Sequence, residues 1–286
     1  MSIVIEHLSY IYSPKTPYEK RALDDVSFTI EDGDFFGIIG HTGSGKSTLV
    51  SHLNALTRVT QGTIRVDDMD LSAKKLDFKR LRKTVGMVFQ YPEYQLFDET
   101  VLKDVMFGCK NVGMTEEEAT AAARAALTAV GLDPDEVGER SPFDLSGGQK
   151  RRVAIAGVIA MQPKVLVLDE PTAGLDPRGK NEILTLIGEI KKMCPTIVMI
   201  SHNMDEIARC CNRIAVMSGG KLLGVYAPKE LFGARDKVLA AGLELPGVTA
   251  LANRLADAGL VVARDTLTEA ALTEQLLAAW GGKTHA

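Results

Sequence analysis

The chain has 286 residues, 45% of them hydrophobic and 24% charged, and its 33 Lys and Arg against 37 Asp and Glu give a formal net charge of −4. This composition is typical of a globular protein and excludes intrinsic disorder, a collagen and a small disulfide-rich scaffold. The near-neutral charge offers no overall basic surface for nucleic acid. No apolar run approaches the about 18 residues that cross a bilayer. The N-terminus lacks the features of a signal peptide, and the four cysteines lack metal-site spacing, so we expect a soluble protein of the reducing cell interior.

The N-terminal part of the chain predicts three strands and then a glycine-rich loop. Apolar runs at residues 3–8, 23–30 and 35–39 are bounded by Asp, Gly or Pro, which is typical of strands separated by turns. Residues 40–47 interrupt this pattern with three glycines. The leucine and valine spacing that follows predicts a helix over residues 47–56.

The middle of the chain predicts a helical insert inside an alternating strand and helix pattern. A short strand is expected at residues 85–89, and residues from about 98 to 161 are expected to be mostly helical. Asp176 before Pro177 has the residue types of a helix start. Further strands are expected at residues 165–168, 196–200 and 214–217. This pattern predicts an α/β fold with a parallel core sheet, an N-terminal antiparallel β subdomain and an inserted helical subdomain.

The composition changes near Ala234, after which Ala and Leu dominate. Residues 266–269 have the form of a capping box, ahead of apolar residues at helical spacing, namely Leu272, Leu276, Leu277 and Trp280. We therefore predict two domains, a main one over residues 1–233 and a small helical one over residues 234–286.

Residues 40–48 match the phosphate-binding loop, or P-loop, and lie between a predicted strand and a predicted helix. Glycines let the backbone N–H groups point at phosphate oxygens, and the helix N-terminus adds a favourable partial charge. Lys46 is expected to reach the β- and γ-phosphates, and the Ser47 hydroxyl to bind Mg²⁺. The predicted nucleotide site comprises Gly40, His41, Thr42, Gly43, Ser44, Gly45, Lys46, Ser47 and Thr48.

The apolar strand at residues 165–168 runs into two carboxylates, Asp169 and Glu170. In a P-loop fold, a carboxylate at the carboxyl end of a strand holds Mg²⁺, which assigns that role to Asp169. Glu170 is then placed to polarise water towards the γ-phosphate as a general base. We expect Glu170 to be a catalytic residue.

A second anion-binding motif lies at Leu145, Ser146, Gly147, Gly148 and Gln149, directly before a predicted helix. Two glycines at a helix N-terminus can bind phosphate through backbone N–H groups. One nucleotide does not need two such sites from a single chain. We therefore expect this loop to close on the γ-phosphate of ATP held by the P-loop of another subunit.

These motifs, in this order, resemble the ATP-binding subunits of ABC transporters, over residues 1 to about 233. The resemblance implies that Gln90 senses Mg²⁺ and water as a ligand and couples to the membrane partner, and that His202 contacts the γ-phosphate. It further implies that Asp176 belongs to a loop crossing the interface between two ATPase subunits, and that Tyr12 stacks on adenine. The implied cofactors are ATP and Mg²⁺.

A narrower resemblance lies in residues 86–97, in residues 142–157 and in the C-terminal helices. These segments are similar to the energy-coupling factor (ECF) and cobalt-type importer ATPases, and to the second of the two ATPase types in such complexes. The resemblance implies that the C-terminal helices help to pair two ATPases. It also implies a groove that receives a transmembrane coupling protein, with the candidate contact residues Gln90, Tyr91, Glu93, Tyr94 and Phe97.

The function implied is ATP hydrolysis that powers uptake of a vitamin or a transition-metal ion through the coupling protein and a substrate-binding membrane subunit. The expected location is the cytoplasmic face of the cell membrane, as a peripheral protein. The sequence leaves open a homodimer or a heterodimer. Another ABC importer or exporter is an alternative, as is a soluble ABC-type ATPase acting on nucleic acid or ribosomes. We expect no nucleic acid partner, since the chain has one copy of each motif and no cysteine clusters.

Overall fold

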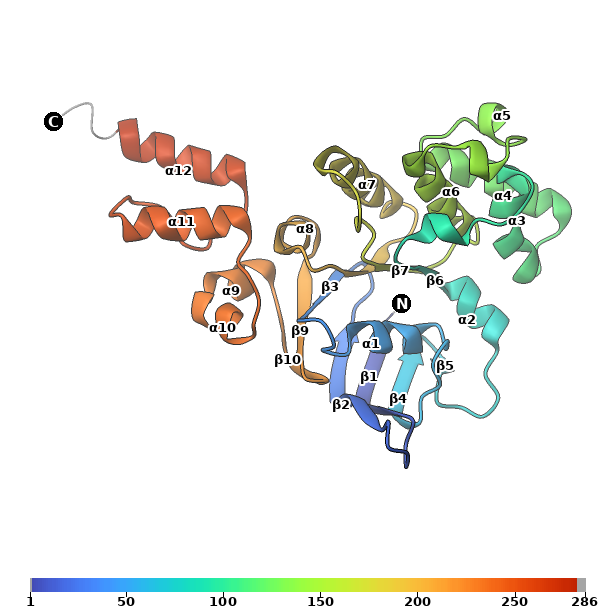
Figure 1. The fold of residues 1–286 in the computed structure, drawn as a ribbon, viewed down its shortest axis with the longest axis horizontal. Helices are drawn as coiled ribbons and strands as arrows, with labels where there is room; N and C mark the ends of the chain where they lie inside the picture. The colour runs from blue at the N-terminus through green and yellow to red at the C-terminus, as the bar shows by residue number, and fades with distance from the viewer. Residues whose placement is uncertain (1, 282–286) are drawn as a thin grey trace.

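The computed structural model describes residues 2–281. Two sheets lie one above the other with helices around them, and Figure 1 shows the helical insert and the C-terminal helices on opposite sides of the molecule. The α/β class and the arrangement of a parallel core sheet, an antiparallel N-terminal sheet and two helical regions are confirmed.

The core sheet has six strands in the order β10-β9-β3-β8-β7-β6. Its strands are parallel except β10, which pairs antiparallel with β9. Every residue of β3, β6 and β8 is buried, which explains why these strands are continuous apolar runs without alternation. The bounds are β3 (Phe35–Ile39), β6 (Val85–Val88), β7 (Val165–Asp169), β8 (Thr196–Ile200), β9 (Arg213–Ser218) and β10 (Lys221–Tyr226).

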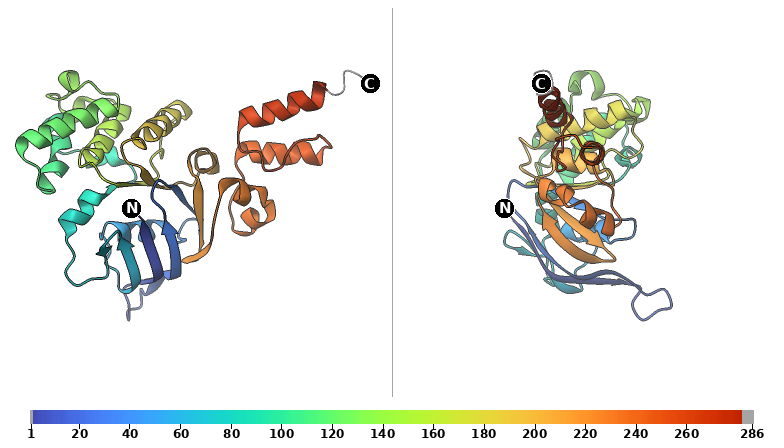
Figure 2. Two further views of the ribbon diagram at one scale, coloured as in Figure 1. Left: turned by 180° about the vertical axis from the view of Figure 1, so that it is seen from behind. Right: turned by 90° about the vertical axis from the view of Figure 1, so that its left-hand side faces the viewer.

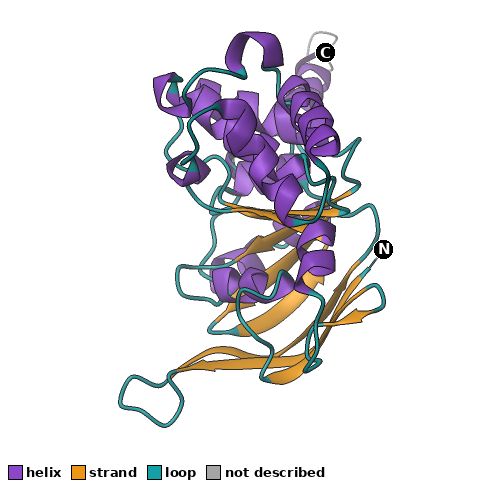
Figure 3. Ribbon diagram, turned by 90° about the vertical axis from the view of Figure 1, so that its right-hand side faces the viewer, coloured by secondary structure: helices purple, strands orange, loops and turns teal. Residues whose placement is uncertain are grey.

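The N-terminal sheet is antiparallel, with the order β2-β1-β4-β5. Its apolar face packs on α1 and on one face of the core sheet, in a cluster that includes Ile5, Leu49 and Phe36. A loop between β1 and β2 extends from this layer (Figure 3). The bounds are β1 (Ile3–Tyr12), β2 (Lys20–Ile30), β4 (Gln61–Val66), β5 (Met69–Asp70) and α1 (Lys46–Leu53).

Helices cover the other face of the core sheet, where a second apolar cluster joins it to the helical insert (Figures 1 and 2). The insert contains α3, α4, α5 and α6, and its position agrees with the expected residues 98–161. The bounds are α2 (Phe78–Thr84), α3 (Val101–Asn111), α4 (Glu116–Ala129), α5 (Pro134–Val137), α6 (Gly147–Ile159), α7 (Pro177–Ile190) and α8 (Met204–Cys210), with short 3₁₀ helices η1 (Pro92–Gln95) and η2 (Pro142–Asp144).

Four helices follow β10: α9 (Pro228–Gly233), α10 (Arg235–Ala240), α11 (Gly247–Asp257) and α12 (Glu269–Gly281). The expected helical C-terminal region is therefore present. Its attachment to the main body includes a hydrogen bond of 2.8 Å from the Gly247 N–H to the Asp205 carboxylate on α8. None of the helices within residues 2–281 is long and apolar enough to cross a membrane.

Two local expectations were wrong. Helix α1 ends at Leu53 rather than at residue 56, because Asn54 leaves the helical conformation and Ala55 has a φ of 54°. The cap of α12 is Thr268, whose hydroxyl accepts from the Ala271 N–H, whereas the Thr266 hydroxyl donates to the Ala263 carbonyl. Of the apolar face expected on α12, Leu272 is buried and Leu277 is exposed.

Candidate functional site

Four neighbouring strands of the core sheet deliver the predicted catalytic side chains to one edge. The P-loop follows β3, His202 follows β8, Asp169 ends β7 with Glu170 directly after it, and Gln90 follows β6. These strands are adjacent and parallel in the order β3-β8-β7-β6. Because the carboxyl ends of parallel strands meet at one edge, side chains far apart in the sequence come together there.

The P-loop is a tight turn that only glycine fits at two positions. A Cβ on Gly40 would lie 2.3 Å from the Met217 carbonyl oxygen, and one on Gly45 would lie 2.5 Å from the Ala22 carbonyl oxygen. Gly45 also has a φ of 103° and directly precedes α1. The first N–H groups of α1 have no partner within the helix, so the loop presents donors to an anion.

Lys46 is held in this loop by two backbone carbonyls. Its Nζ donates to the Gly40 oxygen at 2.7 Å and to the His41 oxygen at 3.1 Å. Burial lowers the pKa of Lys46, and the nearby Glu170 and Asp169 carboxylates oppose that shift. The ammonium group is thus already positioned, so phosphate binding costs little conformational entropy of the Lys46 side chain.

Glu170 lies between Gln90, which is expected to sense Mg²⁺ and water, and His202, which is expected to contact the γ-phosphate. Gln90 Nε2 donates to Glu170 Oε2 at 2.9 Å, and His202 Nε2 lies 2.9 Å from Glu170 Oε1. The Glu170 N–H continues the strand pairing with the Ile200 carbonyl at 3.0 Å. Its φ of 51° turns the side chain away from the run of β7, in a conformation that non-glycine residues seldom adopt. The structure therefore joins Gln90, Glu170 and His202 into one cluster.

Asp169 lies beside this cluster in a partly buried position. Burial and then the neighbouring Glu170 charge raise the pKa of Asp169, while Lys46, His202 and the Ser47 hydroxyl oppose the shift. The described residues hold no cluster of three or more His, Cys, Asp or Glu suited to a metal ion. A P-loop site does not need one, because phosphate oxygens and a hydroxyl supply the remaining ligands of Mg²⁺.

Tyr12 lies at the end of β1 next to the P-loop helix. Its hydroxyl is 3.1 Å from the Thr48 hydroxyl, and its ring packs edge-on against Tyr10 with centroids 4.9 Å apart. Tyr10 in turn packs edge-on against the buried His52 of α1. Tyr12 is 40% exposed, so its ring is open to a ligand, whereas Tyr10 belongs to the packing beneath it.

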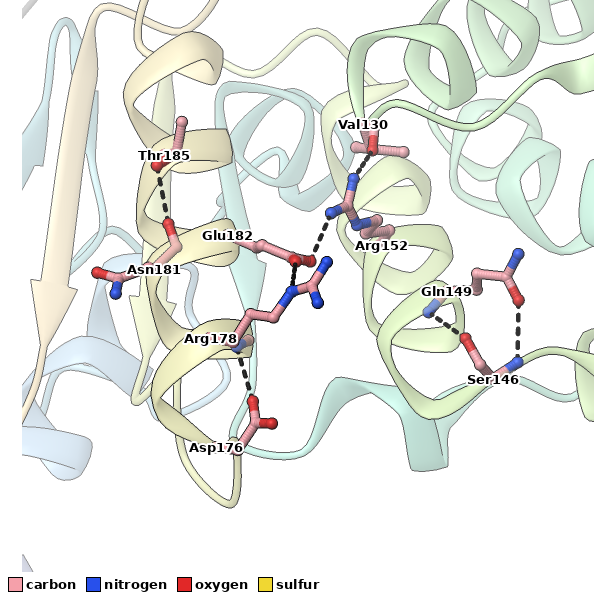
Figure 4. Close-up of polar contacts among 10 residues, drawn as sticks. Val130, Ser146, Gln149, Arg152, Asp176, Arg178, Asn181, Glu182 and Thr185 are labelled. Carbon is pink, nitrogen blue, oxygen red and sulfur yellow. Dashed lines mark hydrogen bonds and ion pairs between the residues drawn. The ribbon is translucent and has the colours of Figure 1, made fainter.

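The loop at Leu145–Gln149, expected to bind an anion, leads into the N-terminus of α6 (Figure 4). The Ser146 hydroxyl accepts from the Gln149 N–H at 3.3 Å, and the Gln149 side chain accepts from the Ser146 N–H at 3.0 Å, which is a capping box. A Cβ on Gly147 or Gly148 would meet nothing within 4 Å. Asp176 caps α7 by accepting from the Gly179 N–H at 2.7 Å. Among the described residues, no hydrogen bond joins Leu145–Gln149 to the P-loop of the same chain.

The segment after Gln90 presents aromatic rings at the surface. Tyr94 is 84% exposed and Phe97 is 57% exposed, and Phe97 packs edge-on against Phe107 of α3. Phe107 also lines a groove of about 360 Å³ between α2, β6 and α3. Other apolar residues of this groove are Leu56, Phe78, Val85, Met87, Phe89, Val112 and Met161.

We expected Glu93 to lie on the docking surface, but its side chain is mostly buried. Both of its carboxylate oxygens bind Arg151, at 2.7 and 2.9 Å, and its side chain is only 17% exposed. Glu93 thus faces into the protein, away from the surface that Tyr94 and Phe97 present.

Two buried polar groups were missed by the sequence analysis. Arg151, on the helix that follows the second loop, is among the largest fully buried side chains. Glu206 of α8 is buried and accepts from the hydroxyls of Thr172 and Ser201 at 2.8–2.9 Å, which ties the residues after β7 to those after β8. Nothing in the sequence indicated that Arg151 is buried. It belongs to the basic run Lys150–Arg152, and such a run usually forms a solvated helix face.

Comparisons with known proteins agree with this geometry. A family model described as ABC transporter matches residues 23–173. The chain is 51% identical over 268 residues, 94% of its length and 93% of the relative's, to the energy-coupling factor transporter ATP-binding protein EcfA2 of Symbiobacterium thermophilum. It is 49% identical over 278 residues, 97% of each chain, to the protein of the same name from Caldanaerobacter subterraneus.

Solved structures that are similar to this chain also belong to ABC transporters. The cbiO1 structure of Clostridium perfringens, part of the ABC transporter complex cbiONQ, matches with a TM-score of 0.72 and 37% identity over 87% of this chain and 97% of that one. The dimeric ATP-binding cassette MJ0796 bound to ADP and Pi matches with a TM-score of 0.68 and 28% identity, over 79% of this chain and 98% of that one.

The fold, the P-loop and the carboxylate pair at the end of β7 define an ABC-type ATPase. Within that class, the chain belongs to the EcfA2 family of energy-coupling factor transporter ATP-binding proteins. The expectations of an ABC ATPase fold, of ATP binding and of the ECF type are confirmed.

Proposed function

We propose that this chain hydrolyses ATP to power uptake of a vitamin or a transition-metal ion by an ECF importer, at the cytoplasmic face of the membrane. The observation that carries the proposal is the cluster of Gln90, Glu170 and His202 beside the P-loop, joined by two contacts of 2.9 Å. This cluster combines a general base with two groups that can respond to the γ-phosphate. The names of the relatives support the ECF assignment.

Hydrolysis needs a water molecule aligned with the γ-phosphate and a base that accepts its proton. In our proposal Glu170 Oε is that base. Gln90 and His202 hold its two oxygens until nucleotide binds, and then contact water and the γ-phosphate. Lys46 binds the β- and γ-phosphates from its fixed place between two carbonyls.

The residues present fit a Mg²⁺ ion. The raised pKa of Asp169 reflects a carboxylate that is partly buried beside a second carboxylate, a setting that a cation relieves. Ser47, Asp169 and Gln90 would hold the ion, which would neutralise charge on the phosphate oxygens when bound.

The open loop at Leu145–Gln149 supports a paired arrangement. Its Gly147 and Gly148 are unobstructed, and among the described residues it makes no hydrogen bond to the P-loop of its own chain. We place it against ATP bound by a second ABC ATPase subunit, with Asp176 at the same interface. The dimeric cassette structure among the matches supports such pairing. The helices of residues 234–286 would contribute to dimerisation, with residues 1–233 as the cassette.

The exposed rings of Tyr91, Tyr94 and Phe97 support a docking surface for the membrane-spanning coupling protein. The Tyr91 and Tyr94 rings lie next to each other, and Phe97 packs on Phe107, which lines the apolar groove, so the segment after Gln90 presents an exposed apolar area. Such an area at a protein surface marks an interaction site. A substrate-binding membrane subunit would join the complex through the coupling protein.

This docking is tested by purifying the tagged chain from membranes. We expect the wild-type chain to retain a small polytopic membrane protein, and a Tyr94→Asp/Phe97→Asp variant to lose it, because charges oppose burial of this surface. ATP hydrolysis by the separated ATPase pair should be unchanged in the variant. Retention of the membrane protein by the variant would place the docking surface elsewhere, and co-sedimentation with ribosomes or DNA would support a soluble ABC-type ATPase instead.

Tyr12 offers a separate test of adenine stacking. We expect Tyr12→Ala to raise the Kd for ATP by about tenfold, because stacking on a base contributes about 1–3 kcal/mol. Tyr12→Phe keeps the ring and loses only the contact with the Thr48 hydroxyl, so its Kd should stay near the wild-type value. Nucleotide titrations measure both, and equal affinities for Tyr12→Ala and the wild type would remove Tyr12 from the site.

A further inference from the structure

Arg151 is a buried cation on the helix that carries the Leu145–Gln149 loop, and it contacts two other functional segments. We propose that Arg151 is a positioning residue that makes the docking segment (residues 91–97), the loop after Glu170 and helix α6 move as one unit during ATP hydrolysis. This inference rests on the proposed function, because it assigns the path by which the catalytic residues and the docking surface are joined.

The contacts of Arg151 join α6 to two other segments, η1 and the loop after Glu170. Nε and Nη2 bind the two oxygens of Glu93 in η1, at 2.9 and 2.7 Å. Nη1 donates to the carbonyl oxygens of Pro171 and Ala173, at 3.2 and 2.9 Å. The guanidinium therefore holds the docking segment on one side and, on the other, the loop that begins directly after Glu170.

A second contact joins the same two segments. A Cβ on Gly174 would lie 3.0 Å from Cε1 of Tyr91, so the Tyr91 ring lies directly against this glycine, whose φ is 75°. Gly174 lies in the same loop as Ala173 and precedes Asp176, the residue expected at the interface between subunits. The docking segment thus contacts this loop directly through the Tyr91 ring. It also contacts the loop indirectly through Arg151, which binds Glu93 on one side and the Pro171 and Ala173 carbonyls on the other.

The chemistry of the site requires arginine. Its planar fork can bind a carboxylate with two N–H groups while a third donates elsewhere, which the compact ammonium of lysine cannot reproduce. A buried ion pair is weak evidence for a stability role, because well-packed apolar residues of similar volume often serve stability as well or better. The four contacts to backbone and carboxylate therefore indicate that Arg151 fixes geometry between moving parts.

The chain offers a matched control in the next residue. Arg152 also joins α6 to another element, through Glu182 of α7 at 3.2 Å and the Val130 carbonyl at 3.0 Å (Figure 4). This pair touches neither the docking segment nor the loop after Glu170. Arg152 has the same helix and the same charge as Arg151, but it does not join the docking segment to the loop after Glu170.

The test uses the complete complex with its membrane subunits, reconstituted in vesicles. The variants are Arg151→Met/Glu93→Leu and, as control, Arg152→Met/Glu182→Leu. We expect the first to fold and to keep the wild-type KM for ATP, because the P-loop is untouched. Its kcat should fall about tenfold, since small misplacements of catalytic groups have effects of this size or larger. Uptake per ATP hydrolysed should fall as well, and the control should match the wild type in all three values.

A wild-type kcat and uptake ratio in the Arg151 double variant would overturn the inference, as would equal losses in both double variants. If the Arg151 double variant does not fold, Arg151→Lys keeps the charge and is expected to show the same low uptake ratio at unchanged KM. Full activity of Arg151→Lys would then overturn the inference. Absence of ATP-driven uptake by the wild-type complex would instead contradict the proposed function, and kcat of the ATPase pair would still report on Arg151.

Discussion

Replacing Glu170 by Gln is expected to lower kcat for ATP hydrolysis at least about 100-fold, because the amide cannot accept the proton of the attacking water. Gln keeps the shape of the side chain and can still lie between Gln90 and His202, which contact the two carboxylate oxygens at 2.9 Å. Binding of ATP should therefore be retained, and the closed pair of subunits should persist because ATP bridges them.

Steady-state phosphate release and nucleotide titration measure the two effects separately. Glu189→Gln, an exposed position on α7, is the matched control and should behave as the wild type. Turnover near the wild-type rate in Glu170→Gln would show that another group accepts the proton, and loss of ATP binding would show that the carboxylate serves the structure of the P-loop.

The second large effect is expected at Lys46. Lys46→Ala removes a cation held by two carbonyl oxygens within the P-loop. A hydrogen bond to a charged group contributes about 1.5–3 kcal/mol, so the Kd for ATP should rise tenfold or more. The fold should be kept, because Lys46 Nζ donates only to carbonyls of its own loop among the described residues.

Titration with a fluorescent ATP analogue checks the Lys46 prediction, and a thermal unfolding curve without nucleotide checks the fold. Lys164→Ala, which removes an exposed lysine far from the P-loop in sequence, is the control. An unchanged Kd in Lys46→Ala would contradict the role assigned to this residue in phosphate binding.

The central strands could be predicted from the sequence because the core sheet is buried on both faces. Runs such as residues 35–39 and 197–200 contain no polar side chain, and each is followed by a motif with recognisable chemistry. β4 and β10 were not predicted. In β4 only Ile64 and Val66 are buried, and β10 has no fully buried residue. Both strands mix apolar with polar or glycine residues, so neither is a continuous apolar run, and each strand depends on pairing with β1 or β9.

The individual members of the candidate site could be predicted, but the contacts between them could not. Gln90 and Glu170 are 80 residues apart, and their hydrogen bond depends on the order of strands in the sheet. The burial of Glu93 could not be predicted for the same reason. Its partner Arg151 lies 58 residues away, and nothing in either local sequence indicates that the two charges meet in the interior.

The central claim, that hydrolysis at Glu170 drives transport, is tested most directly by uptake into vesicles that contain the complete membrane complex. The measurement is ATP-dependent accumulation of the solute that the substrate-binding subunit carries, with the wild-type chain and with Glu170→Gln at equal ATP occupancy. We predict sustained uptake for the wild type and none beyond the first binding event for Glu170→Gln. Sustained uptake by Glu170→Gln, with ATP bound and not hydrolysed, would contradict the account.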